Sequence, residues 1–145
     1  MSKLNSFLFS TLLSSIILTS CKNDGWQTAE TGLKYQIFKD EPGDNVNVGD
    51  VIQMHVKYAT ADDSVLFNTF TSPTPVTMEV PASQFNGSFE EAVLMMSTGD
   101  SAQFMIAADS IFKGDYGAAR PSFIDSGSYL TFTVKILKRE SKSDF

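Results

Sequence analysis

Cysteine and histidine are almost absent from this chain of 145 residues, which contains one of each. A single cysteine excludes an intramolecular disulfide and any cysteine-rich zinc or iron–sulfur site. A single histidine excludes two-histidine metal motifs and argues against a catalytic relay built on histidine. The sequence therefore implies neither a metal nor a cofactor.

Basic residues are also scarce, since 11 Lys and Arg stand against 17 Asp and Glu, for a formal net charge of −6. A surface that binds nucleic acid needs clustered Lys and Arg, so we expect no nucleic-acid partner. No apolar run is long enough for a mature transmembrane helix. What the chain does contain is 12 Phe within a hydrophobic fraction of 42%. This composition excludes wholesale disorder and, at this length, indicates one globular domain.

The first twenty residues have the pattern of an export signal. Lys3 precedes a short apolar stretch diluted by Ser and Thr, as in the n- and h-regions of secretory signal peptides. The stretch ends in Leu18-Thr19-Ser20-Cys21, which resembles the lipobox of bacterial lipoproteins. That resemblance implies cleavage before Cys21 and lipidation of its sulfur and new amine. An ordinary signal with a chance cysteine, or a buried structural cysteine, is the alternative.

The lipobox divides the chain into four parts. Residues 1–20 are expected to be a lipoprotein signal peptide, 21–31 a lipidated tether, 32–140 the folded domain and 141–145 a polar tail. Several acyl chains on Cys21, at about 0.8 kcal/mol per buried methylene, anchor a protein firmly to a membrane. We therefore expect a membrane-anchored protein of the bacterial cell envelope, on its periplasmic or surface face.

Period-two alternation of apolar and polar residues dominates the rest of the chain and predicts strands at residues 33–38, 52–58, 65–70, 76–80, 102–106 and 129–136. Ser88 and Glu91 form a capping box, and apolar residues follow at helical spacing until Gly99, which predicts one short helix. Residues 109–128 read as a long irregular connection. The predicted fold class is α+β, with an antiparallel sheet of five to six strands curved around one short helix.

Two groups that look catalytic have simpler interpretations. His55 falls on the polar face of its strand, so a solvent-facing histidine is favoured over a catalytic one. Glu90 and Glu91 are adjacent acids in the first turn of the helix, where the helix dipole favours them. Neighbouring helical residues point in different directions, so these two do not form an acid–base pair. The long connection, by contrast, is too apolar for a plain linker, and its side chains either fill the core or roof a pocket.

The order of these elements resembles the FKBP-type peptidyl-prolyl isomerases over roughly residues 32–140. The segments that carry the resemblance are Gly49-Asp50 leading to Lys57-Tyr58, Val65-Leu66-Phe67-Asn68, Phe89-Glu90-Glu91-Ala92, Met96-Ser97-Thr98-Gly99-Asp100 and the strand from Leu130 to Leu137. Each segment is short, but their order and spacing together are fairly specific. The resemblance implies an FKBP-like fold and peptidyl-prolyl cis-trans isomerase activity on proline-containing polypeptides. We expect such a protein to be a monomer that assists protein folding.

The resemblance also implies a pocket. Its aromatic residues are Tyr58, Phe67, Phe89 and Phe132, with Val76 and Phe85 at the rim. Ile124 matches the residue whose backbone N–H donates to the substrate carbonyl. Three positions depart from the family: Asn68 replaces an acid, Phe85-Asn86 replaces two aliphatic residues, and either Phe112 or Tyr116 stands for the loop tyrosine. If Phe112 is the match, a hydroxyl beside the substrate is lost.

Such a pocket needs neither a nucleophile nor a metal. Rotation about an Xaa–Pro bond breaks amide resonance over a barrier of about 18–20 kcal/mol. The twisted amide has less charge separation than the planar one, so an apolar pocket favours it over the ground state. Two alternatives stay open from sequence: a non-catalytic FKBP-like binding or chaperone lipoprotein, and an unrelated β-rich lipoprotein whose Phe residues only fill a core.

Overall fold

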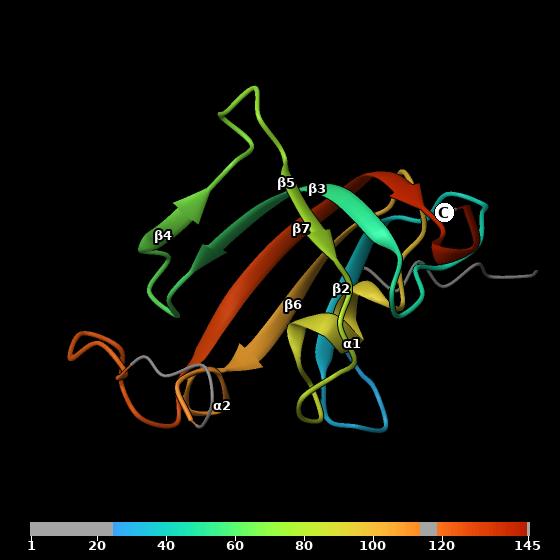
Figure 1. Cartoon of the computed structure of the whole chain (residues 1–145). Coiled ribbons are helices and arrows are strands. Elements are labelled where there is room, and N and C mark those ends of the chain that lie inside the picture. Colours follow the sequence, from blue (N-terminus) through green and yellow to red (C-terminus); the bar gives the residue numbers. More distant parts are fainter. Residues whose placement is uncertain (1–24, 114–118, 145) are drawn as a thin grey trace, which may run out of the picture.

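A computed structural model describes residues 25–113 and 119–144 and shows one antiparallel sheet with short helices (Figure 1). The sheet order is β1-β2-β6-β7-β3-β4, and β5 also pairs with β3. The seven strands within the described ranges are β1 (Gln27–Thr28), β2 (Lys34–Lys39), β3 (Val51–Ala59), β4 (Val65–Asn68), β5 (Val76–Glu79), β6 (Ser101–Ala107) and β7 (Tyr129–Glu140). The helices are α1 (Phe89–Val93), α2 (Ala108–Ile111) and a final 3-10 turn, Lys142–Asp144. The predicted α+β class is confirmed.

The predicted alternation holds along the long central strands. On β3 the inward row of buried residues is Ile52, Met54 and Val56, and Tyr58 continues the same period-two row. On β7 the row is Leu130, Phe132, Val134 and Ile136, three of them buried. Because Tyr58 faces Phe132 in the β3–β7 register, the two inward rows meet as an aromatic pair. The sheet therefore brings aromatic side chains together at one end of its inward face.

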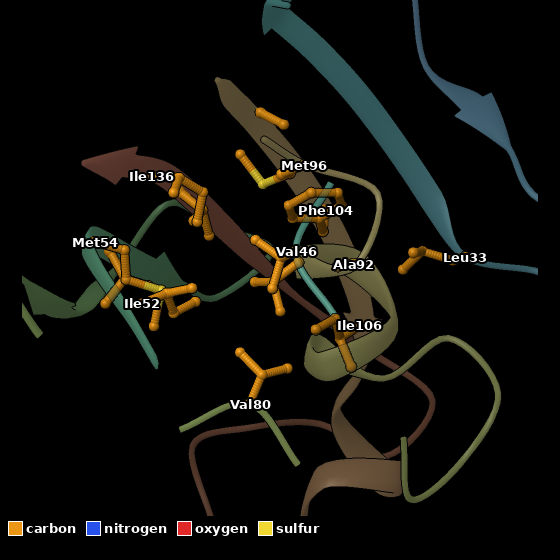
Figure 2. Close-up of a cluster of buried hydrophobic side chains, with 14 residues drawn as sticks. Leu33, Val46, Ile52, Met54, Val80, Ala92, Met96, Phe104, Ile106 and Ile136 are labelled. Atoms are coloured by element: carbon orange, nitrogen blue, oxygen red, sulfur yellow. The ribbon is translucent and has the colours of Figure 1, made fainter. Parts of the chain in front are cut away.

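The other end of that face holds the main core (Figure 2). Val46, from the loop before β3, lies amid side chains contributed by the sheet and by α1. Ala92 and Val93 of α1 are fully buried there, together with Phe104 and Ile106 of β6. Helix α1 thus seals the inward face of the sheet, and its first residue is left at the border between the core and the aromatic end.

Helix α1 is shorter than the sequence predicts. Ser88 caps it as expected, because its hydroxyl accepts the Glu91 backbone N–H at 3.2 Å. The helix ends at Val93, and the chain then follows tight turns, with the Met96 backbone N–H donating to the Val93 carbonyl at 3.1 Å. Gly99 is therefore no helix terminator: it occupies the turn before β6, where its N–H donates to the Ile136 carbonyl.

Gly99 adopts φ +96°, and a Cβ added there would lie 3.0 Å from Cγ of Glu41. Left-handed backbone with a close neighbour disfavours any side chain. We expect Gly99→Ala to lower the free energy of unfolding by about 1–2 kcal/mol in urea titration. Gly25→Ala is the matched control, because nothing lies within 4 Å of its added Cβ. Equal unfolding midpoints for the two variants would contradict this prediction.

Ordered structure begins earlier than predicted, and the last strand is longer than predicted. β1 pairs Gln27 with Tyr35, so ordered structure begins inside the segment expected to be tether. β7 continues to Glu140, beyond the predicted strand. Arg139, which lies beyond the predicted strand, donates to the carboxylate of Asp50 at 2.5 Å. Asp50 is only 2% exposed. Because a buried carboxylate needs a charged or hydrogen-bonding partner, the contact with Arg139 holds the end of β7 in place.

Two other boundaries differ for local reasons. β4 was predicted to reach Phe70 but ends at Asn68, because the hydroxyl of Thr69 replaces a carbonyl as acceptor of the Val56 N–H at 2.9 Å. The long connection contains helix α2, which the sequence analysis missed. Within the two described ranges, no helix has the length and apolarity needed to cross a membrane. Cys21 and Tyr116 lie outside those ranges.

Candidate active site

Four aromatic rings from four elements form a continuous row. The Tyr58 ring of β3 stacks on Phe132 of β7 at 5.1 Å between centroids and on Phe67 of β4 at 5.6 Å. Phe89, the first residue of α1, tilts against Phe132 at 5.4 Å. These spacings lie in the range where aromatic pairs attract. Sheet register and the start of α1 therefore bring together the four aromatic residues predicted for the pocket.

Two hollows flank Phe132 and share Phe132 and Ile111 as walls. The helix-side hollow, of about 110 Å³, is lined by Phe85, Phe89, Glu90, Ile106, Ile111 and Phe132. The loop-side hollow, of about 420 Å³, is lined by Tyr58, Leu66, Ile111, Phe112, Pro121, Phe123, Ile124, Leu130 and Phe132. The loop-side hollow is within the size range of small-ligand sites. An apolar pocket with aromatic walls therefore exists at the end of the sheet.

The other predicted pocket residues are divided by the structure. Phe85 lines the helix-side hollow and Phe112 the loop-side hollow. Asn86 lines a separate small hollow behind Phe85. Val76 packs against the main core and lines neither hollow, which corrects its placement at the rim. Asn68 also lines neither, because its Oδ1 accepts the Phe70 backbone N–H at 2.9 Å.

Ile124 lines the loop-side hollow, but its backbone N–H is engaged. It donates to the Pro121 carbonyl at 3.0 Å, closing a turn, and the Arg120 side chain donates to the Ile124 carbonyl. The role predicted for that N–H, donation to a substrate carbonyl, therefore requires the turn to open. Asn86 is the contrasting case, since its backbone N–H donates to no other group in the part of the chain described.

The remaining lining residues were not assigned to the pocket from sequence, although the apolar side chains of the long connection were left open between filling the core and roofing a pocket. Ile111 belongs to α2, whose presence the loop-like composition of the connection conceals. Ile106 and Leu130 were assigned to strands, but only the register places their side chains at the pocket. Glu90 was interpreted as a first-turn acid, yet it is 9% exposed and lines the helix-side hollow. Its position follows from that of Phe89, its neighbour on α1.

Asp109 ties the pocket loop to α2. Its carboxylate accepts the Gly127 N–H at 2.8 Å and the Ser126 hydroxyl at 3.0 Å, with the Arg120 guanidinium at 3.5 Å. The hydrogen bond from Gly127 above all, then that from Ser126, holds the pKa of Asp109 below its usual range. The carboxylate thus stays ionised at neutral pH. Its bonds fix the loop that carries Phe123 and Ile124 over the hollow.

The chemistry available in this pocket is that of apolar contact and a few donors. Across the described ranges, no three His, Cys, Asp or Glu side chains lie close enough together to hold a metal ion. His55 is placed for packing rather than for a catalytic relay, because its Nδ1 lies 3.3 Å from the Thr69 hydroxyl and its ring packs on Phe70. A bound peptide would meet aromatic faces, which suits differential binding of a twisted amide.

Known proteins resemble this chain in both sequence and fold. Over 124 residues it is 24% identical to the FKBP-type peptidyl-prolyl cis-trans isomerase FkpA of Aeromonas hydrophila, covering 86% of this chain and 44% of that protein. The crystal structure of FkpA from Escherichia coli matches 83% of this chain and 54% of its own, with TM-score 0.66 and 22% identity. A peptidyl-prolyl cis-trans isomerase structure from Pseudomonas syringae matches 81% of this chain and 82% of its own, with TM-score 0.63 and 17% identity. The chain spans about half the length of the FkpA proteins.

These structural likenesses show the fold, and the sequence pattern of the domain shows the family. The model of the family FKBP-type peptidyl-prolyl cis-trans isomerase matches residues 43–137. This range includes the four stacked aromatic residues, all of β3 and β6, and β7 up to Leu137. The chain therefore belongs to the FKBP-type peptidyl-prolyl cis-trans isomerase family.

Proposed function

We propose that this protein is a peptidyl-prolyl cis-trans isomerase of the bacterial cell envelope that accelerates Xaa–Pro rotation in the aromatic pocket. The observation that carries the proposal is the convergence of Tyr58, Phe89 and Phe132 on two adjoining apolar hollows. A proline ring placed against these faces leaves water, and the loss of charge separation in the twisted amide lowers the cost of that transfer. Membership of the isomerase family supports the same activity.

The pocket provides roles for its individual residues. Phe89 and Phe132 receive the proline ring, because both line the helix-side hollow and their rings are in contact. Tyr58 and Ile124 line the loop-side hollow, where the residue preceding proline is accommodated. Phe67 supports Tyr58 by stacking. Asn86 supplies the free backbone N–H beside Phe85, which makes it the donor for a rotating carbonyl.

A non-catalytic binding module is the second candidate. The observation in its favour is the Ile124 N–H, which is already bonded to Pro121 and so is not available to a carbonyl without opening the turn. Such a module would bind proline-containing polypeptides in the same hollows without accelerating rotation. The unrelated β-rich lipoprotein considered from sequence is excluded by family membership.

A protease-coupled assay on the full chain distinguishes the two candidates. A chromogenic peptide is cleaved only when its Xaa–Pro bond is trans, so the slow phase reports isomerisation. We expect the slow phase to accelerate in proportion to protein concentration. Peptide binding without acceleration would establish the binding module and overturn the isomerase proposal.

The membrane location is proposed from the sequence. We take Cys21 to carry the lipid, which places the protein on a membrane of the envelope and exposes its pocket to unfolded envelope proteins. Mass spectrometry of the purified protein tests this directly, because the lipidated chain begins at Cys21 and carries the added mass of acyl groups. A chain that begins elsewhere and lacks acyl mass would contradict the anchor.

Asn68 is expected to influence the choice of ligand more than the rate of rotation. Its Oδ1 accepts the Phe70 N–H, and an Asp side chain retains that acceptor while adding a charge next to Phe67, which stacks on Tyr58. We expect Asn68→Asp to leave kcat within about twofold while changing KM for charged peptides, as for a solvent-screened surface charge. Steady-state kinetics with peptides of opposite charge measure both. A tenfold change in kcat would contradict this assignment.

A further inference from the structure

The pre-helix loop, residues 83–88, forms one wall of the pocket through Phe85. Within the loop, the Ser83 hydroxyl lies 2.9 Å from the Ser88 hydroxyl and donates to the Phe85 carbonyl at 2.9 Å. The Ser88 backbone N–H donates to that same carbonyl at 3.2 Å. These bonds fix the curvature of the loop but tie it only to the start of α1. Its position relative to the rest of the domain needs other contacts.

Glu91 of α1 supplies such a contact. A capping box would direct its carboxylate to the Ser88 N–H, but Oε2 instead accepts the Gly87 N–H at 2.6 Å. Gly87 precedes the helix and has φ +77°, a left-handed conformation that favours glycine. Oε1 accepts the hydroxyl of Thr31. The Glu91 carboxylate thus links the pre-helix loop to Thr31, which lies sixty positions before Glu91.

Thr31 belongs to the amino-terminal turn, residues 29–33. That turn is closed by hydrogen bonds from the Gly32 N–H to the Ala29 carbonyl at 2.9 Å and from the Ala29 N–H to the Leu33 carbonyl at 2.8 Å. Leu33 is 1% exposed and anchors the turn in the core. A hollow of about 100 Å³ behind the pocket is lined by both the turn and the pre-helix loop, through Thr31, Gly32, Leu33, Phe85, Asn86 and Gly87. The amino-terminal turn therefore lies behind the pre-helix loop, on the side away from the pocket.

We propose that Thr31 is a positioning residue for the isomerase site: its hydroxyl holds Glu91 against Gly87 and so fixes the wall that carries Phe85 and the free Asn86 N–H. Thr31 lies before the part of the chain that matches the family, residues 43–137. The segment leading to the proposed membrane anchor is thus a component of the pocket. This inference rests on the proposed isomerase function for its kinetic consequence.

The consequence follows from preorganisation. Without the Thr31 hydroxyl, the pre-helix loop spends part of its time away from the binding position. The apparent affinity for peptide is then the intrinsic affinity multiplied by the fraction of molecules whose loop is in the binding position. The bound complex has the same geometry, so turnover is retained. We expect Thr31→Val to raise KM by about threefold to tenfold with kcat within about twofold, the size of effect that the loss of one ordinary, solvent-exposed hydrogen bond produces. Thr31→Ser keeps the hydroxyl and restores KM.

Thr28→Val is the matched control, because it makes the same chemical change on exposed β1, three residues before Thr31. All variants are compared as the full chain. A Thr31→Val variant with unchanged KM, or one whose KM defect Thr31→Ser reproduces, would overturn the proposal. A loss confined to kcat would also overturn it, because the proposal places the effect of Thr31 on the fraction of loops that are competent to bind.

Amide hydrogen exchange provides a readout that does not depend on activity. We expect Thr31→Val to speed exchange of the Gly87 amide, whose acceptor is Glu91, and to leave the Gly99 amide, which donates to Ile136, unchanged. If the wild-type chain accelerates no prolyl rotation, the proposed function fails. The exchange measurement still tests whether the Thr31 hydroxyl holds Glu91 against Gly87. Unchanged exchange at the Gly87 amide would overturn the positioning role of Thr31 even in an active enzyme.

Discussion

Phe89→Ala is expected to lower kcat/KM for a prolyl peptide by about a hundredfold, the largest loss of activity that the pocket predicts. Phe89 lines the helix-side hollow and packs on Phe132 at 5.4 Å. Truncation removes about 2–3 kcal/mol of apolar contact with the twisted bond, which corresponds to that factor. The protease-coupled assay measures the loss directly.

The control for this variant is Phe38→Ala. Phe38 is 53% exposed on β2 and lines neither hollow, so its truncation should leave activity unchanged. Phe89→Leu provides a second test, because it keeps most of the volume and is expected to lose about tenfold or less. Circular dichroism verifies that each variant folds. Wild-type kcat/KM in a folded Phe89→Ala protein would remove Phe89 from the site.

Asp50→Asn is expected to reduce the free energy of unfolding by about 3 kcal/mol, as when one partner of a buried ion pair is removed. The Asp50 carboxylate is almost fully buried and accepts from the Arg139 side chain and from the backbone N–H groups of Asn47 and Lys142. An amide at this position accepts fewer of these bonds and cannot balance the guanidinium charge. Urea titration at neutral pH measures the difference.

The exposed pair of Lys138 and Glu140 provides the comparison. Glu140→Gln removes the same kind of charge one residue beyond Arg139, where solvent already screens it, so we expect a change of less than about 0.5 kcal/mol. Similar losses for Asp50→Asn and Glu140→Gln would contradict the assignment of Asp50 as a buried anchor of the carboxyl-terminal strand.

The same carboxylate makes stability depend on pH. Burial alone would raise the pKa of Asp50, but the hydrogen bonds from Arg139, Asn47 and Lys142 outweigh it and lower the pKa below 3.8. A depressed folded pKa contributes stability that is complete above the unfolded value and is lost as pH falls through the folded value. We therefore expect the stability difference between wild type and Asp50→Asn to shrink in acid below about pH 4.

Much of the site was predictable because it lies on the strands that alternate most regularly. A period of two fixes which residues of β3 and β7 face inward, so Tyr58 and Phe132 are recognisable as inward aromatics from sequence. Their facing register, however, includes a bulge between Gln53 and Met54, which no alternation pattern reveals. The resemblance to a family, rather than the periodicity, selected these two residues, together with Phe67 and Phe89, as pocket residues.

What the sequence could not predict depends on contacts between distant segments. Ile111 enters the pocket only because α2 begins immediately after β6, within a stretch whose composition resembles a loop. Arg139 belongs to β7, beyond the predicted strand, because the buried carboxylate of Asp50 needs a partner there. Thr31 reaches Glu91 across sixty positions, and no local pattern marks either residue as part of a wall.

We expect the aromatic pocket both to bind prolyl peptides and to accelerate their rotation. Exchange spectroscopy of a labelled Xaa–Pro peptide mixed with the full chain measures both properties in one sample. We predict faster exchange between the cis and trans signals of the peptide, together with shifted ring signals of Tyr58, Phe89 and Phe132. Accelerated exchange without those ring shifts, or ring shifts without accelerated exchange, would contradict this expectation.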